Sequence, residues 1–320
     1  MFKSKPAVVQ PSATGRKKTF WQNIVRYRIL ILMCLPAIVF FFVFNYMPLP
    51  GIWVAFVDYN YQKGIFGSAF VGMDNFKFLY TSGKLWSLTR NTILYNLAFI
   101  VLGNMVAIFM AILLNEIRCK WFKKVSQTMM FLPYFISQVL VGFLVYCILN
   151  YDYGFVNNIL TSLGLERWGP YSDPGVWPVI LVIIQLWQVT GYNSVVYFAA
   201  VMGIDSEIIE AARVDGANGF QKIRRIILPC LKPTVIILLL FAMGGIVKGN
   251  FGLFFNTVGM NSLLYPTTDI IETYVYRATV TNFDFSTASA VGLYQSLIGF
   301  VMVMACNFVV KKIDPDYSLF

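Results

Sequence analysis

The chain contains no histidine among its 320 residues, and its five cysteines show no metal-ligand spacing. Without histidine, His-based catalytic triads and most metal sites are excluded. None of the cysteines lies in a segment that we expect outside the membrane, so we expect no disulfides. The cysteines are Cys34, Cys119, Cys147, Cys230 and Cys306. We therefore expect neither a catalytic residue nor a metal site in this chain.

Charged residues are also scarce, at 12% of the chain against 58% hydrophobic residues. A soluble domain carries about a quarter charged residues, so this composition predicts an all-α membrane protein. Six apolar runs are long enough to cross a bilayer, which takes about 20 residues each. The runs lie near residues 29–56, 91–115, 126–149, 176–202, 231–255 and 289–310. Pro36, Pro133 and Gly191 fall inside runs, which membrane helices tolerate.

Lysine and arginine placement predicts the orientation, because these residues concentrate in cytoplasmic segments. With the N-terminus inside, eighteen of the 25 basic residues fall on the cytoplasmic side. The other seven are Lys63, Lys77, Lys84, Arg90, Arg167, Lys248 and Arg277. Membrane topology thus accounts for the +10 charge without a nucleic-acid partner. We predict a cytoplasmic N-terminal segment at 1–28 that is not a cleaved signal peptide, a six-helix domain at 29–312 and a cytoplasmic tail at 313–320.

A polar segment at 205–229 separates two apolar runs and is patterned like two short helices. Asp205 and Asn218 are suited to cap the two helices. Gly216 permits a backbone turn between them, and Pro229 is expected to end the second helix. The segment therefore predicts a helix–turn–helix projection that fits a partner's groove. An amphipathic loop lying on lipid headgroups is the alternative, since Lys222, Arg224 and Arg225 would suit it.

The spacing of the residues within this segment favours docking on a partner protein over lying on lipid headgroups. Glu210-Ala211-Ala212 is followed after three residues by Gly216, and after nine more by Ile226-x-Leu228-Pro229. The pattern resembles the EAA loop of permease subunits of bacterial ATP-binding-cassette importers, where the loop docks into a separate ATPase subunit. The resemblance implies that the coupling residues are Glu210, Ala211, Ala212, Asp215, Gly216, Ile226, Leu228 and Pro229.

Further segments resemble carbohydrate-uptake permeases, most of all the lipoprotein-linked polysaccharide importer permeases of Gram-positive bacteria. They are residues 35–60, 70–80, 90–96, 113–118, 131–137, 264–278 and 285–300. The resemblance implies a type I importer permease fold in the bacterial cell membrane and an oligosaccharide substrate. It also implies a second, non-identical permease, two ATPase subunits and an extracellular binding (lipo)protein. Since this chain has no GxxxxGK[ST] phosphate loop, we expect no cofactor here, with ATP and Mg on the ATPase partners.

The fourth apolar run carries polar and aromatic side chains that are expensive inside a membrane. Gln185, Gln188 and Tyr192 lie three and four residues apart and therefore share a helix face, and Trp187 lies between them. Amides that bond hydroxyl groups and rings that cover a sugar's apolar face would suit an oligosaccharide pathway. Helix-to-helix hydrogen bonding is the alternative, worth about 1 kcal/mol or less per bond.

The fifth apolar run is interrupted by glycines that weaken a helix. They are Gly244, Gly245, Gly249 and Gly252. Broken helices near mid-membrane recur in transporters, and Lys248 and Asn250 lie in this break. We hypothesise that Lys248 helps bind an acidic, uronate-containing oligosaccharide. The alternative is that Lys248 lies near the outer edge and extends its ammonium group to the interface.

Other function classes are disfavoured by what the spans lack. An ion-driven secondary transporter usually needs acidic residues in the membrane, and the predicted spans contain almost none. A membrane enzyme is disfavoured by the missing histidine and the lack of clustered carboxylates in a span. An importer for a non-sugar solute remains open. We expect external segments at 57–89 and 256–288, and a turn-rich external loop at 150–175.

Overall fold

The computed structural model describes residues 27–313, which fold almost entirely into helices. They divide into two units at residues 52 and 53. The first contains helix α2 (Arg28–Phe41), which continues into a π-helical turn at Phe42–Tyr46. The second begins within a 3₁₀ helix (Leu49–Phe56) and holds all the remaining elements. The N-terminal segment and C-terminal tail that we predicted fall almost wholly outside the described residues.

Six candidate membrane spans are present in this described part of the chain, which confirms the predicted number. Five are continuous helices that are long and apolar enough to cross a bilayer. They are Arg28–Phe56, Lys84–Glu116, Trp177–Met202, Gly219–Met243 and Phe285–Lys312. The sixth is a bent pair, Lys120–Phe135 and Gln138–Leu149, whose parts meet at 97°. The arrangement agrees with an all-α membrane domain.

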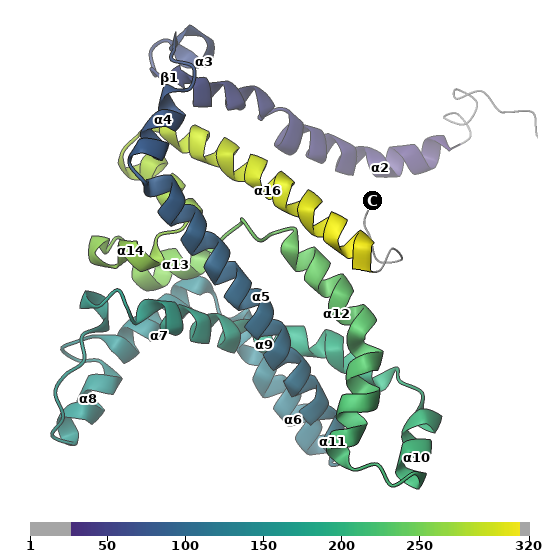
Figure 1. The fold of residues 1–320 in the computed structure, drawn as a ribbon. Helices are drawn as coiled ribbons and strands as arrows, with labels where there is room; N and C mark the ends of the chain where they lie inside the picture. Colours follow the sequence, from purple (N-terminus) through teal and green to yellow (C-terminus); the bar gives the residue numbers. More distant parts are fainter. Residues whose placement is uncertain (1–26, 314–320) are drawn as a thin grey trace, which may run out of the picture. The chain divides into compact units, whose positions relative to one another are not determined.

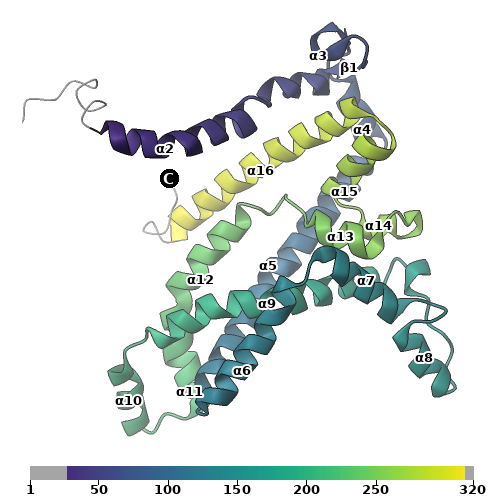
Figure 2. The same cartoon turned by 180° about the vertical axis from the view of Figure 1, so that it is seen from behind.

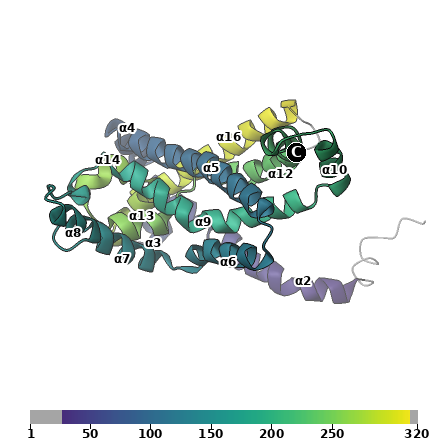
Figure 3. The same cartoon turned by 90° about the horizontal axis from the view of Figure 1, so that it is seen from below.

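Helices α5 (Lys84–Glu116) and α9 (Trp177–Met202) form the centre of the second unit. They lie side by side and run in the same direction (Figures 1 and 3). Ala107 and Ala111 of α5 are fully buried against Tyr197 of α9. Small residues let membrane helices approach closely, and the Tyr197 hydroxyl also hydrogen-bonds to Asn104.

The third apolar run, 126–149, is not one helix as its length suggested. Helix α6 (Lys120–Phe131) passes into a 3₁₀ turn (Leu132–Phe135) that contains Pro133, and helix α7 (Gln138–Leu149) starts in a new direction. Proline lacks a backbone donor and weakens the helix at this point. The end of α6 just before this turn packs tightly on α9, since a Cβ on Gly191 would lie 1.8 Å from the Met130 carbonyl oxygen.

The segment predicted as external at 256–288 is largely folded against the core. It contains the end of α13 (Phe251–Val258), then α14 (Tyr265–Thr268), α15 (Ile271–Tyr276) and a π-helical turn at Arg277–Thr281. Leu264, Ile270 and Ile271 are fully buried. Its tyrosine, asparagine and threonine content suggested exposure, but several of these side chains bond to backbone carbonyls. Helix α16 (Phe285–Ile313) follows.

Shorter elements occupy the other two predicted external segments. Residues 57–89 include an antiparallel pair, β1 (Val57–Asp58) and β2 (Ala69–Phe70). Helices α3 (Gly64–Gly67) and α4 (Asp74–Thr81) also lie here, before α5 begins at Lys84. The turn-rich segment 150–175 contains helix α8 (Phe155–Ser162) and a 3₁₀ turn at Pro170–Ser172.

Candidate functional site

The patterned polar segment forms the helix–turn–helix projection that its sequence predicted. Helix α10 (Ser206–Val214) is capped by Asp205, whose side chain accepts the Glu207 N–H at 2.9 Å. After the turn, Asn218 and Gln221 form a reciprocal capping box with bonds of 2.8 and 2.9 Å. These caps satisfy backbone donors that a helix start leaves unpaired. Figures 1 and 2 show α10 standing out from the bundle.

Gly216 provides the turn between the two helices of this projection. Its φ is +78°, in the left-handed region that residues with a side chain rarely adopt. A Cβ at this position would meet no atom within 4 Å, so backbone conformation rather than crowding requires the glycine. The predicted role of Gly216 as the bend is confirmed.

Pro229 does not end the second helix, contrary to our prediction. Helix α11 (Gly219–Lys222) continues through a π-helical turn (Ile223–Ile227) into α12 (Leu228–Met243), giving one helix from residue 219 to 243. Proline lacks an N–H and clashes with the carbonyl of the preceding turn. The π turn changes the hydrogen-bond register just before Pro229, and such local adjustments let membrane helices accommodate proline. The projection therefore continues directly into a membrane span.

The start of this long helix is anchored to the ends of α5 and α9. Ile227 and Leu231 are buried in a cluster with Ile112 and Val201. Beside this cluster, Lys222 Nζ lies 2.5 Å from Glu116 Oε1, at the last residue of α5. The Lys222 side chain is 13% exposed, so this ion pair lies partly away from solvent.

The predicted coupling residues mostly lie on the surface. Glu210, Ala211, Asp215 and Gly216 are exposed on or beside α10, and Ala212 is half-buried. Further along the chain, Ile226 is half-buried, while Leu228 and Pro229 are exposed.

Large apolar side chains accompany these residues on the projection. Val214 is 89% exposed, and Ile208 and Phe220 are also exposed. Phe220 does not pack against the bundle, whereas Ile223 and Ile227, later in the same helix, do. The projection thus presents both carboxylates and apolar surface.

Gln188 and Gln185, the two amides predicted for the substrate pathway, hydrogen-bond to residues at the breaks between α6 and α7 and between α12 and α13. Gln188 is 4% exposed; its Oε1 accepts from Gln138 Nε2 at 2.9 Å, and its Nε2 donates to the Ile136 carbonyl at 3.1 Å. Gln185 Oε1 accepts from Asn250 Nδ2 at 3.0 Å. This geometry favours the helix-to-helix alternative, most clearly for Gln188, because the partners take up its hydrogen-bonding groups.

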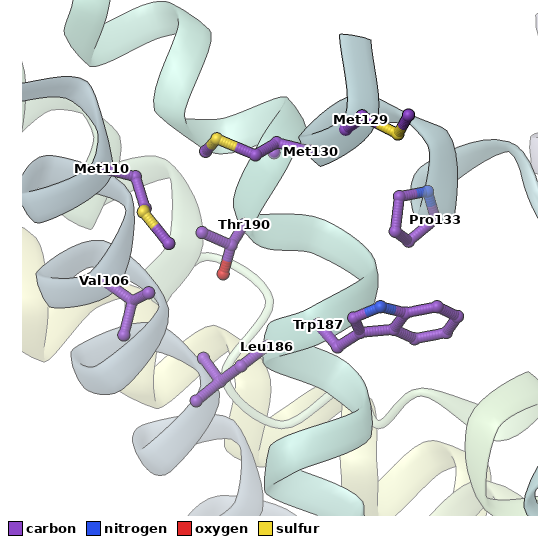
Figure 4. Close-up of a pocket in the computed structure, with 9 residues that line it drawn as sticks. Val106, Met110, Met129, Met130, Pro133, Leu186, Trp187 and Thr190 are labelled. Carbon is purple, nitrogen blue, oxygen red and sulfur yellow. The ribbon is translucent and has the colours of Figure 1, made fainter. Parts of the chain in front are cut away.

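Trp187 and Tyr192 have different surroundings from these amides. Trp187 lines an apolar cavity of about 380 Å³ between α5, α6 and α9 (Figure 4). The other lining residues are Val106, Met110, Met129, Met130, Pro133, Leu186, Thr190 and Gly191. Tyr192 stacks on Tyr134 with ring centroids 4.4 Å apart and is 45% exposed. The aromatic rings are accessible, but the cavity beside Trp187 suits an apolar group better than sugar hydroxyls.

The glycine-rich run breaks as predicted. Helix α12 ends at Met243 and α13 begins at Phe251, so the apolar run 231–255 is two helices rather than one. Asn250 caps α13 by accepting the Leu253 N–H at 3.2 Å. On the other side, Asn96 of α5 donates to the carbonyls of Ile246 and Lys248 at 2.8 and 3.2 Å. These bonds satisfy backbone groups that the break exposes, as membrane burial requires.

Lys248 lines a polar pocket of about 340 Å³ together with Glu272, Gln295 and Ser296. Glu272 Oε1 accepts from the Gly249 N–H at 2.6 Å and from Gln295 Nε2 at 2.7 Å. Its Oε2 is buried and has no hydrogen-bond partner among the described residues. Lys248 is exposed and forms no ion pair within 4.0 Å in this part of the chain.

Glu272 was missed by sequence reasoning because we assigned its segment to an external loop. The sequence did carry a signal, since the acid directly follows the apolar pair Ile270 and Ile271. The structure places this carboxylate at the break in α12–α13.

Comparison with known proteins identifies the family. The sequence family described as binding-protein-dependent transport system inner membrane component matches residues 103–315. Protein LplB of Bacillus subtilis (strain 168) is 31% identical over 96% of this chain and 96% of its own length. The polygalacturonan/rhamnogalacturonan transport system permease protein YteP of the same organism is 31% identical, over 94% and 93%.

A solved structure agrees with this assignment. A chain of a bacterial ATP-binding-cassette transporter involved in the import of the acidic polysaccharide alginate superposes with a TM-score of 0.84 and 32% identity. The match covers 93% of this chain and 100% of that one. The fold and the family assignment predicted from sequence are thereby confirmed. The chain belongs to the binding-protein-dependent inner membrane components, the permease subunits of ATP-binding-cassette importers.

Proposed function

We propose that the protein is a permease subunit that imports acidic oligosaccharides across the bacterial cell membrane. The observation that carries this proposal is its full-length similarity to permeases for polygalacturonan/rhamnogalacturonan and for alginate. Both of those cargoes are polymers that contain uronate sugars, which bear carboxylates. Lys248 supports the same cargo class, because it is an exposed cation that lines a pocket at a broken span.

ATP hydrolysis is assigned to two separate ATPase subunits that carry ATP and Mg. A second, related permease completes the pathway, and an extracellular binding (lipo)protein delivers the cargo. The exposed residues of α10 suit docking on an ATPase subunit, because they combine carboxylates with apolar side chains at a projecting end. This assignment puts the coupling projection and both termini in the cytoplasm.

The continuous helix from residue 219 to 243 suggests how docking is linked to the pathway. A displacement of the projection is carried as a rigid body along this helix. The helix ends at the break that holds Lys248 and Asn250. Closure of the ATPase pair would therefore move one side of the polar pocket relative to α15 and α16, which supply Glu272 and Gln295.

Within that pocket, the Lys248 ammonium is positioned to attract a uronate carboxylate. The carboxylate of Glu272 is the opposing charge, but its Oε1 is engaged by two N–H donors. Ser296 and Gln295 Oε1 offer hydrogen-bonding groups to sugar hydroxyls, while Gln295 Nε2 is engaged by the Val247 carbonyl and by Glu272. We retain Gln185, Trp187, Gln188, Tyr192 and Asn250 as pathway residues, with Gln188 acting chiefly by holding helices together.

An ion-driven transporter is the competing function, and Glu272 is the observation that favours it. An acidic residue against a broken span is the kind of group that such transporters use. Hydrogen bonds from the Gly249 backbone and from Gln295 give this carboxylate a structural role without a coupled ion.

The deciding experiment measures nucleotide hydrolysis by the co-purified complex in lipid vesicles. Binding protein would be added empty, or loaded with galacturonate, alginate or neutral oligosaccharides. We expect loaded acidic oligosaccharides to stimulate hydrolysis and uptake together. Stimulation by neutral sugars alone would overturn the cargo class. Uptake without ATP, abolished by dissipating ion gradients, would establish the competing function.

A further inference from the structure

A second polar pocket, of about 380 Å³, lies at the Lys84 end of α5. The opposite end of α5 carries Glu116, which pairs with Lys222 of the coupling projection. The helix is 33 residues long, which separates its two ends by about 50 Å at 1.5 Å per residue. If the projection meets ATPase subunits in the cytoplasm, the pocket opens on the external side. The side chains that matter are Lys84, Ser87, Tyr265, Asp269, Tyr274 and Arg277.

Arg277 is held in place inside this pocket. Its Nη2 bonds Asp269 Oδ2 at 2.5 Å, and its guanidinium carbon lies 4.0 Å from the centroid of the Tyr265 ring. Asp269 is fixed in turn, because its Oδ1 accepts the Thr273 hydroxyl at 2.7 Å. A guanidinium has five N–H donors in a planar fork. The contact through Nη2 therefore leaves other donors free to bind a planar anion.

Lys84 adds a second cation at the rim. Its ammonium lies 5.8 Å from the centroid of the Tyr274 ring, and the side chain is exposed. Lys84 is the first residue of α5, whose opening turn contains no acidic residue. The positive end of a helix dipole favours anions, so a lysine here is unfavourable for the helix itself. Together, the lysine and the positive end of the helix create a positive potential that attracts an anion.

The charged residues that line the pocket sum to a net positive charge, which Asp284, outside the lining but near Tyr274, partly offsets. Among the lining residues, Lys84 and Arg277 are basic and Asp269 is acidic, which leaves one net positive charge. Asp284 lies outside the lining and bonds the first turn of α16 through the Thr287 N–H at 2.9 Å. The described remainder of the lining is neutral, and Ser87, Ser262 and Asn282 supply hydroxyl and amide groups.

Irregular backbone borders the same pocket. Arg277 opens a π-helical turn that ends at Thr281, and Phe283 has a φ of +54°. Single π turns are frequent at functional sites, and strained residues cluster where the surrounding structure holds a binding geometry. This irregular segment places Arg277, Ala278 and Asn282 along one wall of the pocket.

We propose that this pocket is an external receiving subsite that holds a uronate unit of the cargo. Arg277 and Lys84 bind the carboxylate, the Tyr274 ring covers the sugar's apolar face, and Ser87 and Asn282 bond its hydroxyls. The inference rests on the proposed function, since it assumes an acidic oligosaccharide. It adds a contact that the cargo makes before it reaches Lys248.

The test compares Lys84→Gln with Lys77→Gln in the full complex, reconstituted in lipid vesicles. Lys77 is a matched control, because it is an exposed lysine on nearby α4 that pairs with Asp74 and does not line the pocket. Binding protein would be loaded with a galacturonate tetrasaccharide or with a neutral tetrasaccharide. For the acidic cargo, Lys84→Gln should raise the half-saturating concentration of loaded binding protein about three- to tenfold, with the maximal rate unchanged. Lys77→Gln should match wild type with both cargoes.

Three results would count against the subsite, and they are distinguishable. Equal behaviour of Lys84→Gln and Lys77→Gln would remove it while leaving the acidic cargo intact. An equal shift for acidic and neutral cargo would show that Lys84 contacts the binding protein rather than the sugar. A wild-type complex that responds only to neutral cargo would overturn the proposed function, and the uronate subsite with it.

Discussion

Lys222 Nζ lies 2.5 Å from Glu116 Oε1, so an ion pair joins the coupling projection to the end of α5. The two residues are 106 positions apart in the sequence. Lys222 lies at the end of α11, and Glu116 is the last residue of α5, which also lines the cavity beside Trp187 and the pocket at Lys84. In the proposed mechanism, this contact would give a movement of the projection a second route into the membrane domain, besides the continuous helix to Met243.

Reversing either charge of this pair should reduce the coupling of hydrolysis to uptake. Because Glu116 is 47% exposed, solvent screening limits the pair to about 1 kcal/mol. We expect Glu116→Lys or Lys222→Glu to lower the sugar transported per ATP about two- to fivefold. The double reversal, Glu116→Lys with Lys222→Glu, should recover most of the loss. The surface pair Asp74–Lys77 is the control, and swapping its charges should change nothing.

Gly216→Val should uncouple hydrolysis from transport. The φ of +78° costs a residue with a side chain about 1–2 kcal/mol, so α10 would be reoriented relative to α11. Uptake by vesicles should fall while basal hydrolysis persists. Gly219→Ala, at the start of α11 with no atom within 4 Å of a new Cβ, should retain coupling. Normal uptake by Gly216→Val would refute the role of this turn.

Gln188→Leu should destabilise the protein rather than weaken cargo recognition. The change leaves the Gln138 amide and the Ile136 carbonyl without their partner, at a cost of about 1–3 kcal/mol. Thermal unfolding of the purified complex should shift to lower temperature, with the half-saturating cargo concentration unchanged. Removing both amides, in Gln138→Leu with Gln188→Leu, should cost less than the single change. A change in cargo affinity at normal stability would restore Gln188 as a sugar contact.

Lys248→Ala should impair uptake of acidic oligosaccharides much more than uptake of neutral ones. A charge-assisted hydrogen bond contributes about 1.5–3 kcal/mol, which corresponds to about tenfold or more in affinity. Lys248→Arg keeps the charge and should retain most acidic uptake. Uptake assays with both cargo types distinguish this role from a structural one, because an equal loss of both would indicate a damaged break between α12 and α13.

Much of the coupling projection was predictable from sequence, because its signals are local. Asp205, Asn218 and Gly216 act through backbone groups within a few residues, and their roles agree with the structure. The prediction that Pro229 ends the second helix was wrong because it, too, relied on a local signal alone. A local rule ends a helix at proline, whereas the π turn before it permits the helix to continue.

The substrate-pathway residues were less predictable, because their roles depend on distant partners. Gln188 hydrogen-bonds to residues about fifty positions away, and Glu272 accepts a hydrogen bond from the backbone N–H of Gly249, in the break between α12 and α13. Helix periodicity shows which residues share a face but not what that face contacts. Packing therefore assigned Gln188 to a helix contact and brought Glu272 next to Lys248 in one pocket.

The sequence by itself determined the membrane class, the approximate spans and the coupling motif, since hydrophobicity, charge placement and capping operate over short distances. Only the tertiary structure decided that the run 126–149 bends by 97° and that the segment 256–288 packs inward. It also brought Lys84 and Arg277 to one pocket from distant parts of the chain. These outcomes depend on which backbone and polar groups find partners across helices, and inside a membrane the backbone groups must find one.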